Sequence, residues 1–358
     1  MTTKTVGALC AGFGGLEMAL AQVLPVQVAW YAETNADAAR ILKREHPDAP
    51  NHGDITDALW SRYLPVDIMT MGLPCQPVSA PGKGLAAEDP RWLWPDGRRA
   101  IEEQRPQEVF LENVHGLVSA TWVRGEGVKG EVFRSILEDF RLLRYAVKWL
   151  VLGACVVGAP HHRHRLFLRA TRVPDGAPVP AAQRVGKATY CGAPRTGGRV
   201  LLPTPVARDG DTAKGRGEGS ADYWARRAAT RTNGIPLGAV AAQLPLAPTP
   251  TARDGMGGPG SSGRDGGLNL RTAAVRPEVW GTYAEAVATW EGRFRAAPVP
   301  SEPNTRGGRR LSALLPEWMM GLDLGFLTEE LGREEAIQRA GNGVMPHAGA
   351  AAYRLLSA

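Results

Sequence analysis

Residues 5–23 of the chain read TVGALCAGFGGLEMALAQV. The apolar run Thr5–Leu9 predicts a short strand, and a helical pattern begins near Leu16. Between them lies the turn Ala11–Gly15, whose glycines permit a ligand to approach the backbone closely. This order of strand, glycine-rich turn and helix is typical of an open α/β sheet that binds its ligand at the strand ends.

Alternating strand and helix patterns continue through residues 5–170. Further strands are predicted at residues 27–32, 66–71, 108–111, 147–152 and 165–170, and helices at residues 16–23 and 37–45. This alternation predicts an α/β fold with a doubly wound, mostly parallel sheet. The candidate functional residues cluster where the predicted strands end, which is the edge at which such sheets bind ligands.

The composition changes near Thr171, where Pro, Gly and Arg become frequent and the periodicity weakens. Residues 171–308 contain 18 Lys and Arg against 11 Asp and Glu, whereas the remainder holds 24 and 25, so the net charge of +6 arises in this middle part. A basic module beside a near-neutral one is typical of a nucleic-acid-binding protein, although a solvated basic surface would have the same composition. We therefore expect a main domain at residues 1–170, a smaller inserted domain at 171–308, and a return to the main domain at 309–358. Ordered packing is expected again at residues 311–322, and a last helix at 346–356.

The middle part contains an internal repeat. Residues 203–210 read PTPVARDG and residues 248–255 read PTPTARDG. Two copies are too few for a solenoid. We favour a structural repeat whose equivalent arginines, Arg208 and Arg253, also contact phosphate.

The sequence predicts a cytoplasmic protein. It has no run of about 18 apolar residues that would cross a membrane, and its start does not resemble a signal peptide. Cys10, Cys75, Cys155 and Cys191 show no CxxC spacing, so free thiols in a reducing compartment are expected. No interface is recognisable, and a monomer is the default expectation.

The glycine-rich turn is followed by acids that suit an adenosine ligand. Glu33 lies at the end of the next predicted strand, where a carboxylate suits a ribose diol. The turn is not GxGxxG, which disfavours a dinucleotide and favours a ligand without pyrophosphate, such as S-adenosylmethionine. Asp54 and Ile55 could supply a carboxylate for the adenine amino group and an apolar side for its ring. A tight turn alone would explain the glycines but not both acids.

Two further groups suit methyl transfer to a pyrimidine. Cys75 follows a predicted strand on a Pro-flanked turn, which favours an exposed nucleophile over a buried thiol. Glu112 ends another apolar strand, where burial would raise its pKa and suit it to protonate a ring nitrogen. Addition of a thiolate at C6 with assistance at N3 makes C5 a carbanion equivalent that accepts a methyl group.

A histidine-rich segment precedes two arginines that share one face of a strand. His161, His162 and His164 have no cysteine or carboxylate at ligand spacing, so a metal site is not favoured. Arg163 and Arg165 are two residues apart, and parallel guanidinium groups suit a nucleotide phosphate and the carbonyl of a base.

Together these segments resemble the C5-cytosine DNA methyltransferases in motif order and spacing. The resemblance rests on Leu9–Gly15, Pro74–Ser79, Glu112–Val114, Arg163 with Arg165, and Gly341–Pro346. It covers roughly residues 1–170 and 309–358, and it implies the class I S-adenosylmethionine-dependent methyltransferase fold with residues 171–308 as target recognition domain. It also implies sequence-specific methylation of C5 of cytosine in double-stranded DNA, with the base flipped out of the helix. Both a restriction-modification setting and a solitary or phage-encoded enzyme fit the resemblance.

The resemblance assigns roles to individual residues. Cys75 is the nucleophile, Glu112 contacts N3 and the exocyclic amine, and Arg163 and Arg165 hold the flipped cytosine. Gln76 and Ser79 lie on the loop that closes over DNA. The cofactor site is expected to contain Phe13, Gly14, Glu33, Asp54, Ile55, Gly72, Pro74, Leu93, Asn342 and Val344.

The chain departs from the family pattern at three positions. Cys10 stands where the family usually has a cofactor-stacking Phe, and Thr34 stands where Trp is frequent. Adenine packing is therefore expected to rely on Ile55 and Leu93. His161 replaces the usual Gln before the two arginines.

Two alternative functions fit the same scaffold. The first is an RNA cytosine-5 methyltransferase, against which the large basic insert argues. The second is a catalytically silent DNA-binding regulator, which would have no need of Cys75, Glu112, Arg163 and Asn342 together.

Overall fold

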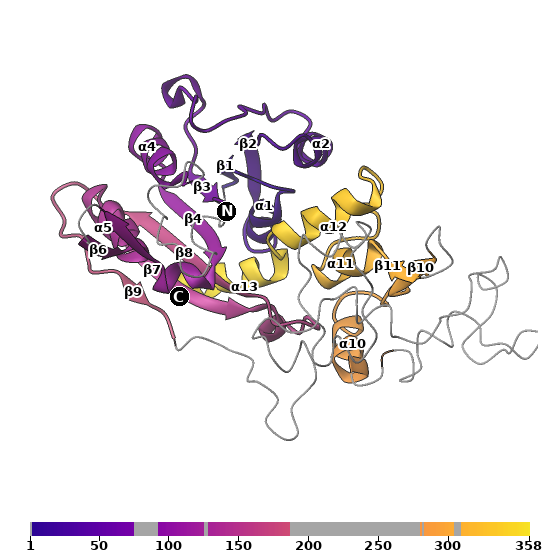
Figure 1. Cartoon of the computed structure of the whole chain (residues 1–358). Helices are drawn as coiled ribbons and strands as arrows, with labels where there is room; N and C mark the ends of the chain where they lie inside the picture. Colours follow the sequence, from indigo (N-terminus) through magenta and orange to yellow (C-terminus); the bar gives the residue numbers. More distant parts are fainter. Residues whose placement is uncertain (1, 75–91, 125–127, 187–279, 281–282, 304–308) are drawn as a thin grey trace, which may run out of the picture. The chain divides into compact units, whose positions relative to one another are not determined.

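The computed structural model describes residues 2–74, 92–124, 128–186, 280, 283–303 and 309–358. The chain divides into two units. The first consists of residues 1–157, 163–190 and 343–358, and the second of residues 158–162 and 191–342. The first unit is thus assembled from three separate stretches of sequence (Figure 1).

A seven-stranded sheet lies at the centre of the first unit. Its strands are β1 (Lys4–Leu9), β2 (Val26–Ala32), β3 (Ile68–Met71), β4 (Glu108–Val114), β7 (Tyr145–Gly153), β8 (His164–Arg172) and β9 (Gln183–Arg184). The strand order is β2-β1-β3-β4-β8-β7-β9, and β8 runs antiparallel to both of its neighbours. The other neighbouring strands pair in parallel. The predicted mostly parallel sheet is confirmed, and each predicted strand overlaps an observed one.

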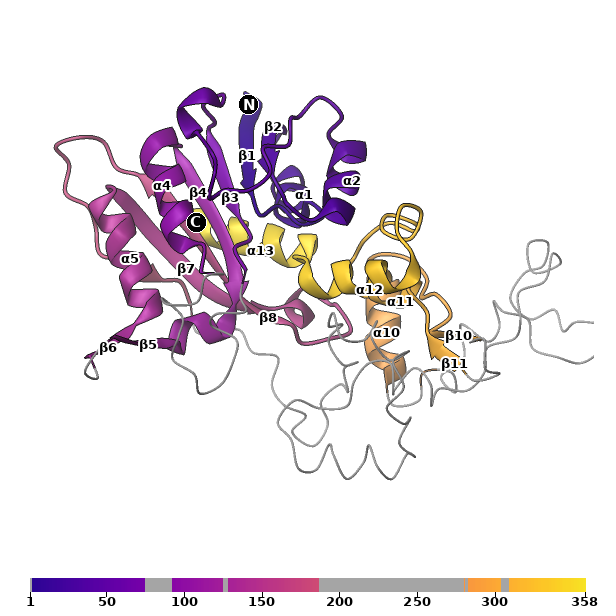
Figure 2. The same ribbon diagram turned by 45° about the horizontal axis from the view of Figure 1, so that its top comes forward.

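Helices cover both faces of this sheet (Figure 2). They are α1 (Gly15–Ala21), α2 (Ala36–Glu45), α4 (Trp94–Gln104), α5 (Val132–Leu142) and α13 (Pro346–Ser357). Along β4, the Phe110 ring meets Tyr353 of α13 edge-on, with ring centroids 5.2 Å apart. Its neighbours Val109 and Leu111 belong instead to the core that contains Ile101 of α4 and Ile136 of α5. Because successive strand residues face opposite sides, β4 is buried on both faces, as the doubly wound fold requires.

The strand order reverses between β1 and β3, because β2 pairs with one edge of β1 and β3 with the other. Open α/β sheets bind ligands at such a point, beyond the carboxyl ends of the strands. Leu9 and Met71 are paired at these ends, and the N–H of Gly72 donates to the Leu9 carbonyl at 3.1 Å. The glycine-rich turn and the segment that leads to Cys75 therefore start side by side.

The remaining elements are short. The first unit also contains the 3-10 helices η1 (Trp60–Arg62), η2 (His115–Ser119) and η3 (Ala154–Val157) and the antiparallel pair β5 (Thr121–Arg124) and β6 (Val128–Glu131). The second unit contains α10 (Ala284–Glu291), β10 (Ser301–Pro303), β11 (Arg309–Leu311), α11 (Leu314–Met319) and α12 (Arg333–Asn342). The ordered packing predicted at residues 311–322 is confirmed, since Trp318 is fully buried and its carbonyl accepts from the indole N–H of Trp290 at 3.0 Å.

The described part of the chain includes no helix with the length and apolar character needed to cross a membrane. Cys10 is a free cysteine, whereas Cys155 is disulfide-bonded. The prediction that all four thiols are free is therefore wrong.

Candidate active site

The glycine-rich turn takes a backbone conformation that few side chains tolerate. Cys10, Gly12 and Gly14 have φ angles of 49°, 58° and 88°, in the left-handed region that glycine adopts without a steric cost. Gly14 is the N-cap of α1, and the N–H of Gly12 donates to Oε2 of Glu33 at 2.8 Å. The turn after β1 is therefore fixed by the acid that follows β2.

Glu33 is held by backbone groups on both of its carboxylate oxygens. Oε1 accepts from the N–H of Asn35 at 2.7 Å, opposite the bond to Gly12. The Asn51 side chain accepts from the Glu33 N–H at 3.1 Å and donates to its carbonyl at 3.0 Å. Since each carboxylate oxygen has a second lone pair, Glu33 is oriented and can still accept from the two hydroxyls of a ribose.

Asp54 and Ile55 follow at the same edge. The Asn51 side chain also accepts from the N–H of Gly53 at 3.0 Å, which continues the network toward them. Asp54 is exposed and accepts from the backbone and hydroxyl of Thr56, both at 2.8 Å, whereas Ile55 is buried. One residue thus presents a charge and the next an apolar side chain.

Cys10 lies close to both acids. Burial, together with the negative charges of Glu33 and Asp54, raises the pKa of its thiol to about 12. The thiol is therefore protonated at neutral pH and is not a nucleophile. Cys10 and Leu93, both partly buried, pack against the core cluster that contains Ile55.

The C-terminal motif approaches the glycine-rich turn at van der Waals distance. A Cβ on Gly15 would lie 2.4 Å from the carbonyl oxygen of Val344, and a Cβ on Gly343 would overlap the Phe13 ring. The structure therefore brings Phe13, Gly14 and Val344 to one place, at the start of α1. Asn342 is the exposed last residue of α12, in the second unit.

Glu112 lies on β4 and Arg165 on the neighbouring strand β8. Arg163 precedes β8 and has left-handed backbone, so the prediction that the two arginines share one face of a strand is wrong. Glu112 lies within β4 instead of ending it, because pairing with β8 continues as far as Val114 and Arg165. The Nε of Arg165 is 3.0 Å from Oε1 of the buried Glu112. Arg163 is also buried, has a φ angle of 32°, and donates from Nη2 to the Gly343 carbonyl.

Burial raises the pKa of Glu112 above its ordinary value, and the positive charges of Arg165 and Arg163 oppose this rise. Desolvation favours the neutral acid, while the guanidinium groups fix where its oxygens point. Such a group can donate a proton or a hydrogen bond to the ring nitrogen of a base.

Asn113 is a further candidate residue, to which the sequence analysis assigns no role of its own. Its side chain donates from Nδ2 to the carbonyl of Leu73 at 3.1 Å, and its Oδ1 accepts from the N–H of Val114 at 2.8 Å. Asn113 therefore connects β4 to the segment just before Pro74. Asn35 and Asn51 were also missed: Asn35 caps α2 by accepting from the N–H of Ala38, a common helix-start signal.

The segment that contains the predicted nucleophile begins at the switch point. Gly72 passes close to the turn, since a Cβ there would lie 3.0 Å from the Cys10 carbonyl oxygen. Pro74 is the last residue before the gap in the described chain. The following predicted site residues lie outside the described residues: Cys75, Gln76, Ser79, Arg208 and Arg253.

Comparison with known proteins supplies a family. The model of the family described as C-5 cytosine-specific DNA methylase matches residues 5–189, just over half of the chain. The type II methyltransferase M.NgoBV of Neisseria gonorrhoeae is 34% identical over 148 residues, which are 41% of this chain and 35% of that protein. M.NlaIV of Neisseria lactamica is 36% identical over 138 residues, which are 38% of this chain and 33% of that protein. The chain therefore spans about a third of the length of these relatives.

Solved structures with the same fold cover almost the whole chain. The methyltransferase EhMeth of Entamoeba histolytica matches with a TM-score of 0.54 and 12% identity, over 99% of this chain and 98% of that chain. A DNMT2 variant of Spodoptera frugiperda matches with a TM-score of 0.52 and 14% identity, over 99% of this chain and 100% of that chain. At such low sequence identity the structural similarity shows the fold alone. That fold is the predicted class I methyltransferase fold. The family match confirms the resemblance that the five motifs predict.

Proposed function

The chain belongs to the family of C-5 cytosine-specific DNA methylases, and from that membership we propose that it methylates C5 of a cytosine within a specific sequence of double-stranded DNA. The observation that carries the proposal is the buried Glu112–Arg165 pair, 3.0 Å apart, on the neighbouring strands β4 and β8. The pKa of the Glu112 carboxyl group is raised by burial. Groups with such shifted pKa values cluster at functional sites, and a neutral carboxyl group can donate to a pyrimidine ring nitrogen.

The proposed reaction starts with the addition of the Cys75 thiolate to C6 of a flipped cytosine. Glu112 gives a proton to N3, so the electron pair that the thiolate pushes into the ring can reside at C5 and attack the methyl carbon of the donor. The bond between that carbon and the donor breaks, and its electron pair stays on the donor. Solvent then takes the C5 proton, the thiolate leaves C6, and the N3 proton returns to Glu112, which restores the aromatic ring and the free enzyme. Arg165 pairs with Glu112, and Arg163, which directly precedes β8, is assigned to the carbonyl of the base.

The methyl donor that fits the residues at the switch point is S-adenosylmethionine, which supplies an electrophilic methyl group on a sulfonium ion. The oriented carboxylate of Glu33 suits the ribose hydroxyls, and Ile55 and Leu93 suit the adenine ring. Asp54 remains exposed for the adenine amino group. The proposed cofactor site also includes Gly72, Pro74, Phe13, Gly14, Val344 and Asn342.

Double-stranded DNA is the proposed partner, and residues 171–308 are the proposed target recognition domain, because the chain's excess of positive charge arises there. Gln76, Ser79, Arg208 and Arg253 are the proposed DNA contacts. We place the protein in the cytoplasm with its DNA substrate, as a monomer, and as the modifying partner in a restriction-modification system.

Base-resolution bisulfite sequencing tests this function. DNA from a methylation-free host that expresses the chain should show protected cytosines within one sequence motif, and the Cys75→Ala variant should show none. Absence of protection with a folded wild-type protein would contradict DNA methylation. A labelled-methyl assay on RNA would then separate an RNA methyltransferase from a silent DNA-binding protein.

A further inference from the structure

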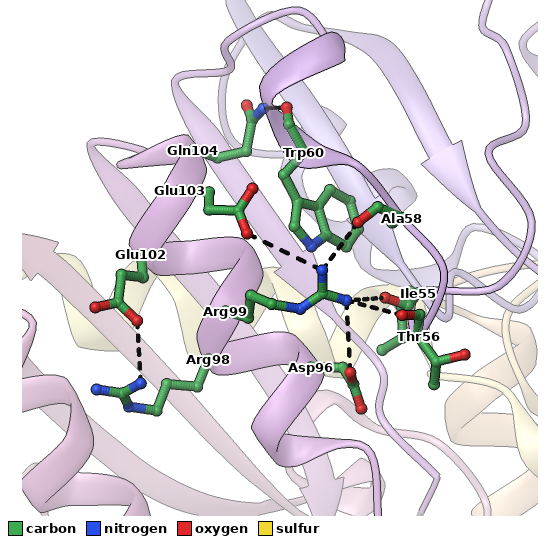
Figure 3. Close-up of polar contacts among 10 residues, drawn as sticks. All are labelled: Ile55, Thr56, Ala58, Trp60, Asp96, Arg98, Arg99, Glu102, Glu103 and Gln104. Carbon is green, nitrogen blue, oxygen red and sulfur yellow. Dashed lines mark hydrogen bonds and ion pairs between the residues drawn. The ribbon is translucent and has the colours of Figure 1, made fainter.

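One guanidinium group joins α4 to the segment that contains Ile55. The Nη2 of Arg99 donates to the carbonyls of Ile55 and Thr56, and its Nη1 donates to the carbonyl of Ala58, each at 3.0 Å (Figure 3). Hydrogen bonds from a charged donor are stronger than neutral ones. A single side chain therefore fixes three peptide groups of a segment that has no regular secondary structure.

Acidic residues on the same helix hold that guanidinium in place. Asp96 is 3.6 Å from Nη2 and Glu103 is 4.0 Å from Nη1, at the i−3 and i+4 positions where helical side chains meet (Figure 3). Gln104 adds a second attachment, since its amide donates to the carbonyl of Trp60. Two consecutive turns of α4 thus anchor residues 55–60.

The anchored segment and the start of α4 supply opposite parts of one proposed site. Ile55 is buried in the core cluster, and Leu93, the N-cap of α4, packs against the same cluster. Both side chains are assigned to the adenine ring in the function proposed above, on which this inference rests. Arg99 connects the backbone of Ile55 to α4, the helix whose N-cap is Leu93, and so links the two parts of the chain.

We propose that Arg99 is a positioning residue for the cofactor, which holds the Asp54–Ile55 side of the adenine site against α4. The role matters in this chain because Cys10 and Thr34 lack the aromatic rings usual at those places in the family. The site then depends on the spacing of two aliphatic side chains. Lysine can replace Arg99 only in part, because it lacks the planar fork of N–H groups that reaches three carbonyls at once.

The neighbouring Arg98 is a matched control. It lies on the same helix, its side chain is 34% exposed against 36% for Arg99, and it pairs with Glu102 at 3.0 Å and Asp139 at 3.3 Å. It donates to none of the three carbonyls among the described contacts. Arg98→Gln removes the same charge from the same helix without touching the segment that contains Ile55.

The test measures binding of S-adenosylmethionine by calorimetry to the full-length wild type, Arg99→Gln, Arg99→Lys and Arg98→Gln. Loss of a charge-assisted hydrogen bond changes an equilibrium constant by about tenfold. We expect Arg99→Gln to raise both the Kd and the KM for the cofactor about tenfold, with kcat at saturating cofactor unchanged. Arg99→Lys should fall between it and the wild type, and Arg98→Gln should match the wild type.

Hydrogen exchange of the amides of residues 55–60, without cofactor, gives an independent readout. Arg99→Gln should accelerate this exchange, and Arg98→Gln should not. Unchanged cofactor affinity in Arg99→Gln would overturn the inference, even if exchange were faster, since Arg99 would then serve packing alone. A wild type that neither binds the cofactor nor methylates DNA would instead overturn the proposed function.

Discussion

Glu112 combines two requirements that usually conflict, because it is both buried and paired with a cation. A carboxyl group that is only buried is neutral, but nothing fixes the orientation of its oxygens. A carboxylate in an exposed ion pair is oriented, but it is ionised and cannot donate a proton. The pair with Arg165 at 3.0 Å inside the sheet gives direction, while desolvation raises the pKa. A proton donor for a base nitrogen needs both properties.

Glu112→Gln should therefore lower kcat strongly while leaving cofactor binding intact. The amide can still donate a hydrogen bond but cannot transfer a proton, and such transfer contributes about 10²–10⁴-fold to a rate. Single-turnover methyl transfer measures the loss. Glu108→Gln makes the same change near the other end of β4, where Glu108 pairs with Arg169 at 2.7 Å, and it should retain activity in folded protein. Equal rates for Glu112→Gln and wild type would contradict a role in the chemistry.

The candidate residues of the site could be found from the sequence where a motif contains them, as with Glu33, Glu112 and Arg165. Residues whose side chains bind backbone groups of another segment could not be found from the sequence. Arg98 and Arg99 are adjacent in sequence and chemically identical, and only the folded path of residues 55–58 distinguishes them. Asn51 is likewise an ordinary loop residue until its bonds to Glu33 and Gly53 are seen.

Whole strands were predicted better than their ends. The prediction began β3 at residue 66, but Asp67 lies outside the strand because its carboxylate accepts from the N–H and hydroxyl of Thr5. The prediction ended β4 at residue 111, where polar residues begin, although pairing with β8 continues to Val114. Apolar runs locate strands, whereas long-range partners decide where pairing stops.

A buried carboxyl group joins α1 to β3. Oε1 of Glu17 accepts from the hydroxyl of Thr70, and Oε2 has no hydrogen-bond partner among the described residues. Burial raises the pKa of Glu17 above its ordinary value of 4.5, and the bond from Thr70 opposes the rise. The neutral acid is therefore the form that the packing of these two elements favours.

The raised pKa predicts a stability that depends on pH. The contribution of Glu17 is fully present below the unfolded-state pKa and is lost as pH rises through the folded-state pKa. Relative to Glu17→Gln, which keeps the bond to Thr70, the wild type should lose up to about 1.4 kcal/mol of unfolding free energy per pH unit across that window. Urea unfolding of both proteins from pH 4.5 upward measures it. A constant difference between them would show that Glu17 ionises normally.

At the scale of the first unit, the C-terminal segment closes against the N-terminal helix. α13 packs on α1 and on β7 and β8, and Tyr353 donates to Glu108 at 2.9 Å. The approach is close because glycines face it: a Cβ on Gly15 would lie 2.4 Å from the Val344 carbonyl oxygen. The glycine at the start of α1 is thus required by this contact.

Gly15→Ala should therefore destabilise the protein by about 1–3 kcal/mol, the usual cost of overpacking. It should also weaken binding of S-adenosylmethionine, since Val344 would be displaced from Phe13 and Gly14. Gly116→Ala is the control, because a Cβ there meets nothing within 4 Å, and its effect should stay within about 0.5 kcal/mol. Thermal unfolding compares the two variants. Equal melting temperatures would show that the segment around Val344 can move to accommodate the added methyl group with no loss of stability.

The same closure has a consequence for biosynthesis. Arg354 donates to the carbonyl of Gln22 across 332 positions of sequence, so a ribosome that adds roughly 5–20 residues per second makes α1 on the order of tens of seconds before its cover. Throughout that interval the apolar side of α1 faces water or a chaperone. Slower translation therefore lengthens the time for which the unfinished chain exposes this surface.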